Sequence, residues 1–170
     1  MPRKPELNGQ ITAGWALAGR RSNVAIVDET PAKTLALSHT IAVVGASRYE
    51  GKEAHSVPLQ MKRHGWRVIP INPYADEIWG EKAYPSLRAL VESGDLTDPI
   101  DIVNVFRPSD QAGPVVRDAI DVGAKAVWLQ QGIVSAEGRR MAEAAGITYI
   151  EDNCMAVTRA VWAVSKRDGD

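Results

Sequence analysis

The chain has 170 residues, of which 45% are apolar and 24% charged, and its formal net charge is −1. This length and composition predict one compact domain with a buried core and exclude a disordered polymer. The near-neutral charge gives no electrostatic reason to expect a nucleic acid or an anionic membrane as partner. No apolar run approaches the roughly 20 residues that span a bilayer, so no membrane is expected as partner either.

The single cysteine and the first residues bear on the compartment. Cys154 excludes a disulfide within the chain and is typical of a reducing environment, so we expect the protein in the cytoplasm. Residues 11–19 loosely resemble a signal peptide, but the stretch is rich in glycine and Arg20 and Arg21 follow it directly. We therefore interpret residues 1–27 as an N-terminal arm of unassigned role, in which residues 23–27 could form a short extended piece.

Beyond the arm, helical and strand-like segments alternate. Capping residues and apolar periodicity predict helices over residues 28–38, from about 56 to Gly65, over 87–91, from Ser109 to Gly123, from Ser135 to Gly146 and over 156–164. Continuous apolar runs predict strands over residues 41–44, 66–71, 100–106, 126–129 and 147–150, with a Pro- and aromatic-rich connection after the second. This alternation predicts an α/β, Rossmann-like fold: an open parallel five-stranded sheet with helices on both faces. We expect one domain over residues 28–165 and a C-terminal tail over 166–170.

In an open parallel sheet, ligands bind beyond the carboxyl ends of the strands, near the point where strand order reverses. The residues that directly follow each strand are therefore the candidates for ligand binding. They are Gly45, Ala46, Ser47 and Arg48 after the first strand, Asn72, Pro73 and Tyr74 after the second, Phe106, Arg107 and Pro108 after the third, Gln130, Gly132 and Ile133 after the fourth, and Asn153 and Cys154 after the fifth. Lys52 and Ser56, near the start of the second helix, complete the set.

The first of these loops resembles two phosphate-binding motifs and satisfies neither. Ser47 stands where a dinucleotide fingerprint needs its second glycine, and Asn72 replaces the acidic residue that would hold a ribose. A Walker A loop needs four residues between its glycines and a hydroxyl after its lysine, but five residues separate Gly45 from Gly51 and Glu53 follows the lysine. Ordinary NAD use and ATP hydrolysis are therefore disfavoured.

The same loop still suits an anion. The Ser47 hydroxyl and backbone amides near a helix start can donate to phosphate oxygens, and Arg48 supplies a permanently charged planar fork. Lys52 adds a second positive charge. The alternative interpretation is a glycine turn followed by a solvated arginine.

The other strand ends suit a long, thin and amphipathic ligand. Apolar walls are offered by Pro73, Phe106, Pro108 and Ile133, and amide groups by Asn72, Gln130 and Asn153. A pantetheine arm needs this mixture, since it carries two amides and several methylenes. The alternative for Phe106 is that it merely fills the core.

No residue is predicted to be catalytic or to bind a metal. Asp152 and Arg107 could form an acid–base pair, although a structural ion pair is commoner. The three histidines, at positions 39, 55 and 64, lack the spacing of metal ligands. Cys154 could act as a nucleophile or form a mixed disulfide with a ligand thiol, but we favour an inert, small apolar residue.

Several motifs in order resemble one family. The segments IAVVGAS, RVIPINP, GEKAYPSL, DIVNVFRP, AKAVWLQQGI and DNC are similar to the small stand-alone CoA-binding proteins, and to the CoA-binding domain of the succinyl-CoA synthetase α subunit. The resemblance covers residues 33–157 and implies CoA or acyl-CoA along the C-terminal edge of the sheet. The nucleotide part would meet residues 45–48, flanked by 72 and 73, and residues 106–108 and 130–133 would line the remainder.

The resemblance has two departures and one consequence for activity. Asn153 stands where the stand-alone members usually place arginine, and the arm over 1–27 has no counterpart. Synthetase catalysis uses a phosphorylated histidine in a second domain and an ATP-grasping partner subunit, and we expect neither here. The sequence therefore predicts non-catalytic binding of CoA. The alternatives are an acyl-CoA-using enzyme subunit and a redox-sensing domain that binds NAD(H).

The sequence also offers a surface for a homodimer, formed by an edge strand and Trp162. The alternative is that this end of the chain is solvated.

Overall fold

The computed structural model of the protein describes residues 30–167. The predicted arm, its extended piece at 23–27 and the first two residues of the predicted helix 28–38 lie outside this range. Residues 168–170 of the predicted tail also lie outside it.

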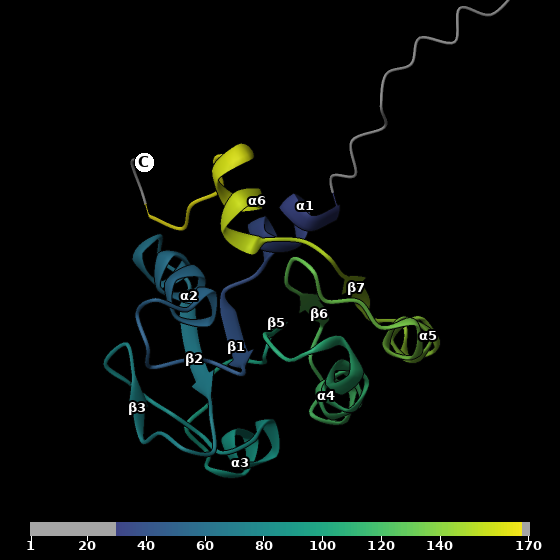
Figure 1. Cartoon of the computed structure of the whole chain (residues 1–170), viewed down its shortest axis with the longest axis horizontal. Helices are drawn as coiled ribbons and strands as arrows, with labels where there is room; N and C mark the ends of the chain where they lie inside the picture. Colours follow the sequence, from purple (N-terminus) through teal and green to yellow (C-terminus); the bar gives the residue numbers. More distant parts are fainter. Residues whose placement is uncertain (1–29, 168–170) are drawn as a thin grey trace, which may run out of the picture.

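Within the described residues, the core of the fold is one open sheet of parallel strands in the order β2-β1-β5-β6-β7 (Figure 1). The strands are β1 (Thr40–Val44), β2 (Arg67–Ile71), β5 (Ile102–Val105), β6 (Ala126–Leu129) and β7 (Thr148–Ile150). The chain leaves β1 toward β2 on one side and returns to β5 on the other side of β1. The strand order therefore reverses at β1, and the predicted five-stranded parallel sheet is confirmed.

Helices cover both faces of this sheet, as predicted. One face carries α1 (Thr30–Leu37), α2 (Glu53–Arg63) and α6 (Met155–Val161), and the other carries α3 (Leu87–Glu92), α4 (Ser109–Asp121) and α5 (Ala136–Ala145) (Figure 1). Along β1, Ile41 and Val43 pack toward the α1–α2–α6 face, and Ala42 between them packs toward the other. Side chains alternate along a strand, so continuous apolar runs bury both faces of the sheet.

Local signals set several helix ends. Ser86 and Ser135 cap α3 and α5, since their hydroxyl oxygens accept from backbone N–H groups at 3.1 and 2.9 Å. Helix α6 ends at Val161, three residues before the predicted end, because Ala163 adopts a left-handed conformation with φ of 50°.

No helix within residues 30–167 has both the length and the apolar character that a membrane crossing requires.

One element was absent from the prediction. Strands β3 (Glu77–Ile78) and β4 (Glu81–Lys82) form a small antiparallel hairpin in the connection after β2. Trp79 and Gly80 form its two-residue turn with φ of 59° and 75°, as a primed hairpin turn requires. The hairpin is fastened to α2: the Trp79 indole N–H donates to the His55 carbonyl at 3.1 Å, and the Lys62 ammonium donates to the Trp79 carbonyl at 2.6 Å.

A buried carboxylate ties three strands together at the amino edge of the sheet. Asp101 Oδ2 accepts from the backbone N–H groups of His39 and Thr40 at 2.7 and 3.0 Å, and its Oδ1 accepts from the Lys125 ammonium at 2.7 Å. Burial alone raises the pKa of Asp101, but the bond from Lys125 and the two backbone bonds outweigh it and hold the pKa below its ordinary value.

We expect Asp101→Asn to destabilise the fold by about 1–3 kcal/mol at pH 7, since buried donors then lose a charged acceptor. Because the folded-state pKa lies below the unfolded value, the carboxylate stabilises the fold above about pH 4, and this contribution is lost as the pH falls further. Urea unfolding at pH 7, 4 and 3 should therefore show a difference from the parent protein that is nearly constant down to about pH 4 and shrinks below it. The exposed Asp98→Asn is the matched control, and an equal loss at every pH would contradict the assignment.

Candidate functional site

The loop after β1 sits where the strand order reverses, pressed against the end of β5. Gly45 has φ of +84°, and a Cβ there would lie 2.6 Å from the Phe106 carbonyl oxygen. The Gly45 N–H donates to the Ile71 carbonyl at 3.2 Å, so the loop also contacts the end of β2. Only glycine fits this conformation and this approach without strain.

Beyond Gly45 the loop is fixed by its own hydrogen bonds. Ser47 Oγ accepts from the Tyr49 N–H at 3.1 Å and can still donate its own proton to a ligand. The Ser47 N–H donates to the Ala54 carbonyl at 3.1 Å, and Nδ1 of His55 donates to the Ser47 carbonyl at 2.7 Å. Helix α2 therefore holds the loop through two main-chain groups of one residue.

Arg48 lies exposed at the tip of this loop. Its guanidinium carbon is 5.3 Å from the centroid of the Tyr49 ring, and its Nη2 donates to the Tyr49 hydroxyl at 3.3 Å. The side chain is thus oriented by an aromatic neighbour while its charge stays accessible.

Asn72 joins the second loop to the first. Its Nδ2 donates to the Ala46 carbonyl at 2.8 Å, and its Oδ1 accepts from the Tyr74 N–H at 2.7 Å. The predicted free amide is therefore engaged in holding two loops together.

These two loops enclose a cleft at the carboxyl ends of β1 and β2. Two hollows, of about 420 and 240 Å³, share lining residues Gly45, Ala46, Asn72 and Tyr74; Ser47, Arg48 and Tyr49 also line the first, and Val44, Ile71, Pro73, Pro85 and Arg107 the second. We call these two hollows the edge cleft. It brings together the predicted residues of the first two loops and Arg107, and its lining contains no carboxylate, imidazole or thiol.

The remaining predicted residues do not line the edge cleft. They are Lys52, Ser56, Phe106, Pro108, Gln130, Gly132, Ile133, Asn153 and Cys154. Phe106 and Cys154 are half-buried and pack against the core of the α1–α2–α6 face, in keeping with the core-filling alternative for Phe106 and with the small apolar role favoured for Cys154. Ile133 packs against the opposite core, whereas Lys52 and Pro108 are exposed at the starts of α2 and α4.

Gln130 belongs to a buried polar cluster that the prediction missed. It is 3% exposed, its Nε2 donates to Asn104 Oδ1 at 2.8 Å, and its Oε1 accepts from the Met155 N–H at 3.3 Å. Asn104 is fully buried in β5. A polar residue inside the apolar run of a strand is the signal that could have pointed to this cluster, since buried amides need partners.

Asp152 and Arg107 do not form the pair that the sequence suggested. Asp152 Oδ1 accepts from the Gly132 N–H at 2.7 Å, and the Arg107 guanidinium donates to Gln111. The Asn153 amide oxygen likewise accepts from the Thr158 hydroxyl at 2.6 Å and stabilises the start of α6. No group of His, Cys, Asp or Glu side chains suited to a metal ion occurs within residues 30–167.

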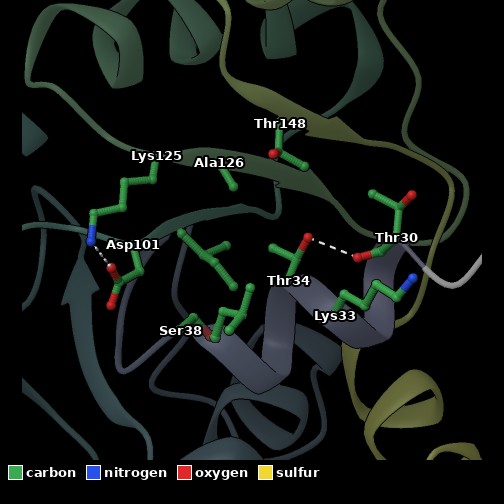
Figure 2. A pocket seen from close by; sticks show the side chains of 10 residues that line it. Thr30, Lys33, Thr34, Ser38, Asp101, Lys125, Ala126 and Thr148 are labelled. Carbon is green, nitrogen blue, oxygen red and sulfur yellow. Dashed lines mark hydrogen bonds and ion pairs between the residues drawn. The ribbon is translucent and has the colours of Figure 1, made fainter.

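A separate hollow of about 460 Å³ lies at the opposite, amino edge of the sheet (Figure 2). Its lining comes from α1 and from the starts of β5, β6 and β7: Thr30, Lys33, Thr34, Leu37, Ser38, Asp101, Ile102, Lys125, Ala126 and Thr148. We call it the amino-edge groove. None of the predicted ligand-binding residues lines it.

Comparison with known proteins identifies the family of the chain. The family described as "CoA binding domain" matches residues 39–160. The chain is 40% identical over 124 residues to the Bacillus subtilis protein YneT, covering 73% of this chain and 87% of that protein. It is 30% identical over 106 residues to the ADP-forming acetate–CoA ligase II of Archaeoglobus fulgidus, covering 61% of this chain but only 15% of that enzyme.

Solved structures agree with these sequence relatives. A Pyrococcus horikoshii protein superposes with a TM-score of 0.73 at 31% identity, covering 82% of this chain and 94% of that one. A Thermus thermophilus protein gives 0.69 at 34% identity, covering 77% and 95%. The sheet, its reversal of strand order and the glycine loop there define a Rossmann-like domain. The chain belongs to the CoA-binding domain family, which confirms the predicted resemblance and gives it a CoA-related role.

We expect Gly45→Ala to destabilise the protein by about 1–3 kcal/mol, because a Cβ in the left-handed region is strained and here also meets a carbonyl oxygen. Gly51→Ala is the control in the same loop, since a Cβ there would meet nothing within 4 Å. Thermal and urea unfolding of both variants measure the difference. Equal midpoints would show that the two strand ends do not approach as described.

Proposed function

We propose that this protein binds CoA or acyl-CoA without transforming it, with the phosphates of the ligand in the edge cleft. The observation that carries the proposal is the shared lining: Ser47 and Arg48 from the first loop and residues 72–74 from the second border one hollow where the strand order reverses. Nucleotide ligands of open parallel sheets bind at this point.

The charge of the cleft supports phosphate as its ligand. Arg48 and Arg107 border the two hollows, and each presents an exposed guanidinium. A guanidinium pairs with phosphate oxygens through two parallel bonds, and the Ser47 hydroxyl can add a neutral donor. With no carboxylate in the lining, nothing in the cleft opposes an anion.

The pantetheine arm would run from Arg107 along the ends of β5 and β6. Pro108 is exposed at the start of α4, Ile133 is half-buried beyond it, and both give apolar contact. Because the Gln130 carboxamide is engaged inside the protein, we expect backbone groups of residues 131–133, not the Gln130 side chain, to meet the amides of the arm.

Two observations support binding without chemistry. General acid–base or nucleophilic catalysis needs a titratable or nucleophilic side chain beside the reacting atoms; toward the end of the proposed arm, the Asp152 carboxylate is engaged by the Gly132 N–H at 2.7 Å and Cys154 packs against the core of the α1–α2–α6 face. The chain also spans only 15% of the Archaeoglobus fulgidus ligase. Turnover of an acyl-CoA by the purified protein would favour the enzyme-subunit alternative instead.

Measurement can distinguish CoA binding from the NAD(H) alternative. An NAD(H) site is disfavoured because Asn72, which replaces the usual acidic residue, bonds the Ala46 carbonyl. Native mass spectrometry of freshly purified protein distinguishes CoA, acyl-CoA and NAD by mass, and thermal shift with each ligand tests native-state binding.

A cytoplasmic location fits the lone cysteine. The homodimer stays a prediction, which analytical ultracentrifugation can test.

Arg48→Ala should weaken CoA binding by about 10- to 100-fold, since a hydrogen bond to a charged group contributes about 1.5–3 kcal/mol. Isothermal titration calorimetry with CoA measures this change, and the affinity for pantetheine, which lacks phosphate, should stay as in the parent protein. Arg140→Ala removes the same charge from the exposed side of α5 and is the control.

Equal loss of CoA affinity in the Arg48 and Arg140 variants would reduce the effect to net charge. Loss of pantetheine affinity in the Arg48 variant would place Arg48 beside the wrong part of the ligand. Either result would contradict the proposed position of the phosphates.

A further inference from the structure

One imidazole holds the first loop from the side of α2. Nδ1 of His55, which is half-buried in the first turn of this helix, donates to the Ser47 carbonyl at 2.7 Å. A ring nitrogen that faces a carbonyl oxygen at this distance carries the proton, so the bond also fixes the tautomer of His55. His55 itself does not line the edge cleft. Any contact between its ring and a ligand in the cleft therefore passes through the loop.

The bond to the Ser47 carbonyl also orients the next N–H group of the loop. A trans peptide is planar, and its carbonyl oxygen and its N–H point in opposite directions. The peptide between Ser47 and Arg48 therefore turns the Arg48 N–H away from the His55 ring. This N–H has no hydrogen-bond partner among residues 30–167, and Ser47 and Arg48 both line the first hollow of the edge cleft. It is thus a main-chain donor that an anion in the cleft can use.

The β3–β4 hairpin in turn holds the His55 ring. The rings of Trp79 and His55 have centroids 5.9 Å apart and planes at 57°, and the Trp79 indole N–H donates to the His55 carbonyl at 3.1 Å. The turn position of Trp79, with φ of 59°, favours glycine, asparagine or aspartate, and a bulky residue there is strained. The contacts of Trp79 with His55 and with the core of the α1–α2–α6 face offset this strain. They indicate a role for tryptophan beyond closing the turn.

We propose that His55 is a positioning residue for the phosphates of the bound ligand: by holding the Ser47 carbonyl toward α2, it aims the Arg48 N–H into the edge cleft. The inference rests on the proposed function, since it assigns a further donor to the same phosphates. Arg48 then offers both its guanidinium and its main-chain N–H to the anion, with the Ser47 hydroxyl beside them. Without the imidazole, the peptide between residues 47 and 48 is free to turn, and binding has to order it first.

Isothermal titration calorimetry of two variants of similar shape tests this proposal. In His55→Asn, the amide nitrogen takes the place of Nδ1 and can donate to the Ser47 carbonyl, whereas His55→Leu has a methyl group there. We expect the leucine variant to bind CoA about 3- to 10-fold more weakly than the parent protein, and the asparagine variant within about twofold of it. The affinity for pantetheine, which lacks phosphate, should stay the same in both variants. His39→Leu, which removes an exposed imidazole at the amino edge of the sheet, is the control.

The outcomes separate this inference from the proposed function. A leucine variant that binds CoA as tightly as the parent protein would overturn the positioning role alone. Equal losses in the leucine and asparagine variants, or a parallel loss of pantetheine affinity, would show that position 55 only supports the fold and would overturn it as well. A parent protein that binds no CoA would overturn both proposals.

Nuclear magnetic resonance of the parent protein gives a readout that does not depend on how the variants fold. In a titration with CoA, the Arg48 amide proton should shift downfield, because a hydrogen bond to a phosphate oxygen deshields it. Titration with pantetheine should leave this resonance in place, and the Gly94 amide, which bonds Val91 after α3, is the internal reference. An Arg48 amide resonance that stays unchanged, in a protein shown by calorimetry to bind CoA, would overturn the proposal.

Discussion

The approach of Gly45 to the carbonyl oxygen of Phe106 is the constraint on which the site depends. At this point the chain leaves β1 for one side of the sheet and later returns on the other, so two crossovers diverge and expose the strand ends between them. A side chain at position 45 would push the ends of β1 and β5 apart. The absence of one Cβ therefore lets the loop with Ser47 and Arg48 lie over the sheet, with α2 starting directly behind it.

The sequence predicted the frame of this fold well because its signals are local. Unbroken apolar runs marked strands that are buried on both faces, and Ser135 and Gly146 marked the ends of α5. The β3–β4 hairpin was missed because two-residue strands are too short for any alternation to show. For the site, the sequence placed residues correctly after each strand, but it could not tell which polar groups were already satisfied.

The amides show why this distinction is not local. Asn72 and Gln130 both follow strands and both look available in the sequence, yet one bonds the Ala46 carbonyl and the other bonds Asn104 and the main chain at Met155. These partners lie at least 25 residues away, and only the assembled sheet brings them within reach. Asn104, Gln130 and Met155 in turn fasten β5, β6 and α6 to one another, so this buried cluster supports the cleft without bordering it.

The hairpin contacts have a consequence for how ligand preference can change. Trp79 bonds the main chain of His55, and the His55 ring bonds the Ser47 carbonyl, so the shape of the first loop depends on a segment some 30 positions later in the chain. Lys62 clamps the same hairpin through the Trp79 carbonyl and through Glu81 at 2.8 Å. Substitutions at Lys62, Trp79 or Glu81 are therefore a route to changing the ligand selectivity of the first loop while every side chain that borders the ligand stays the same.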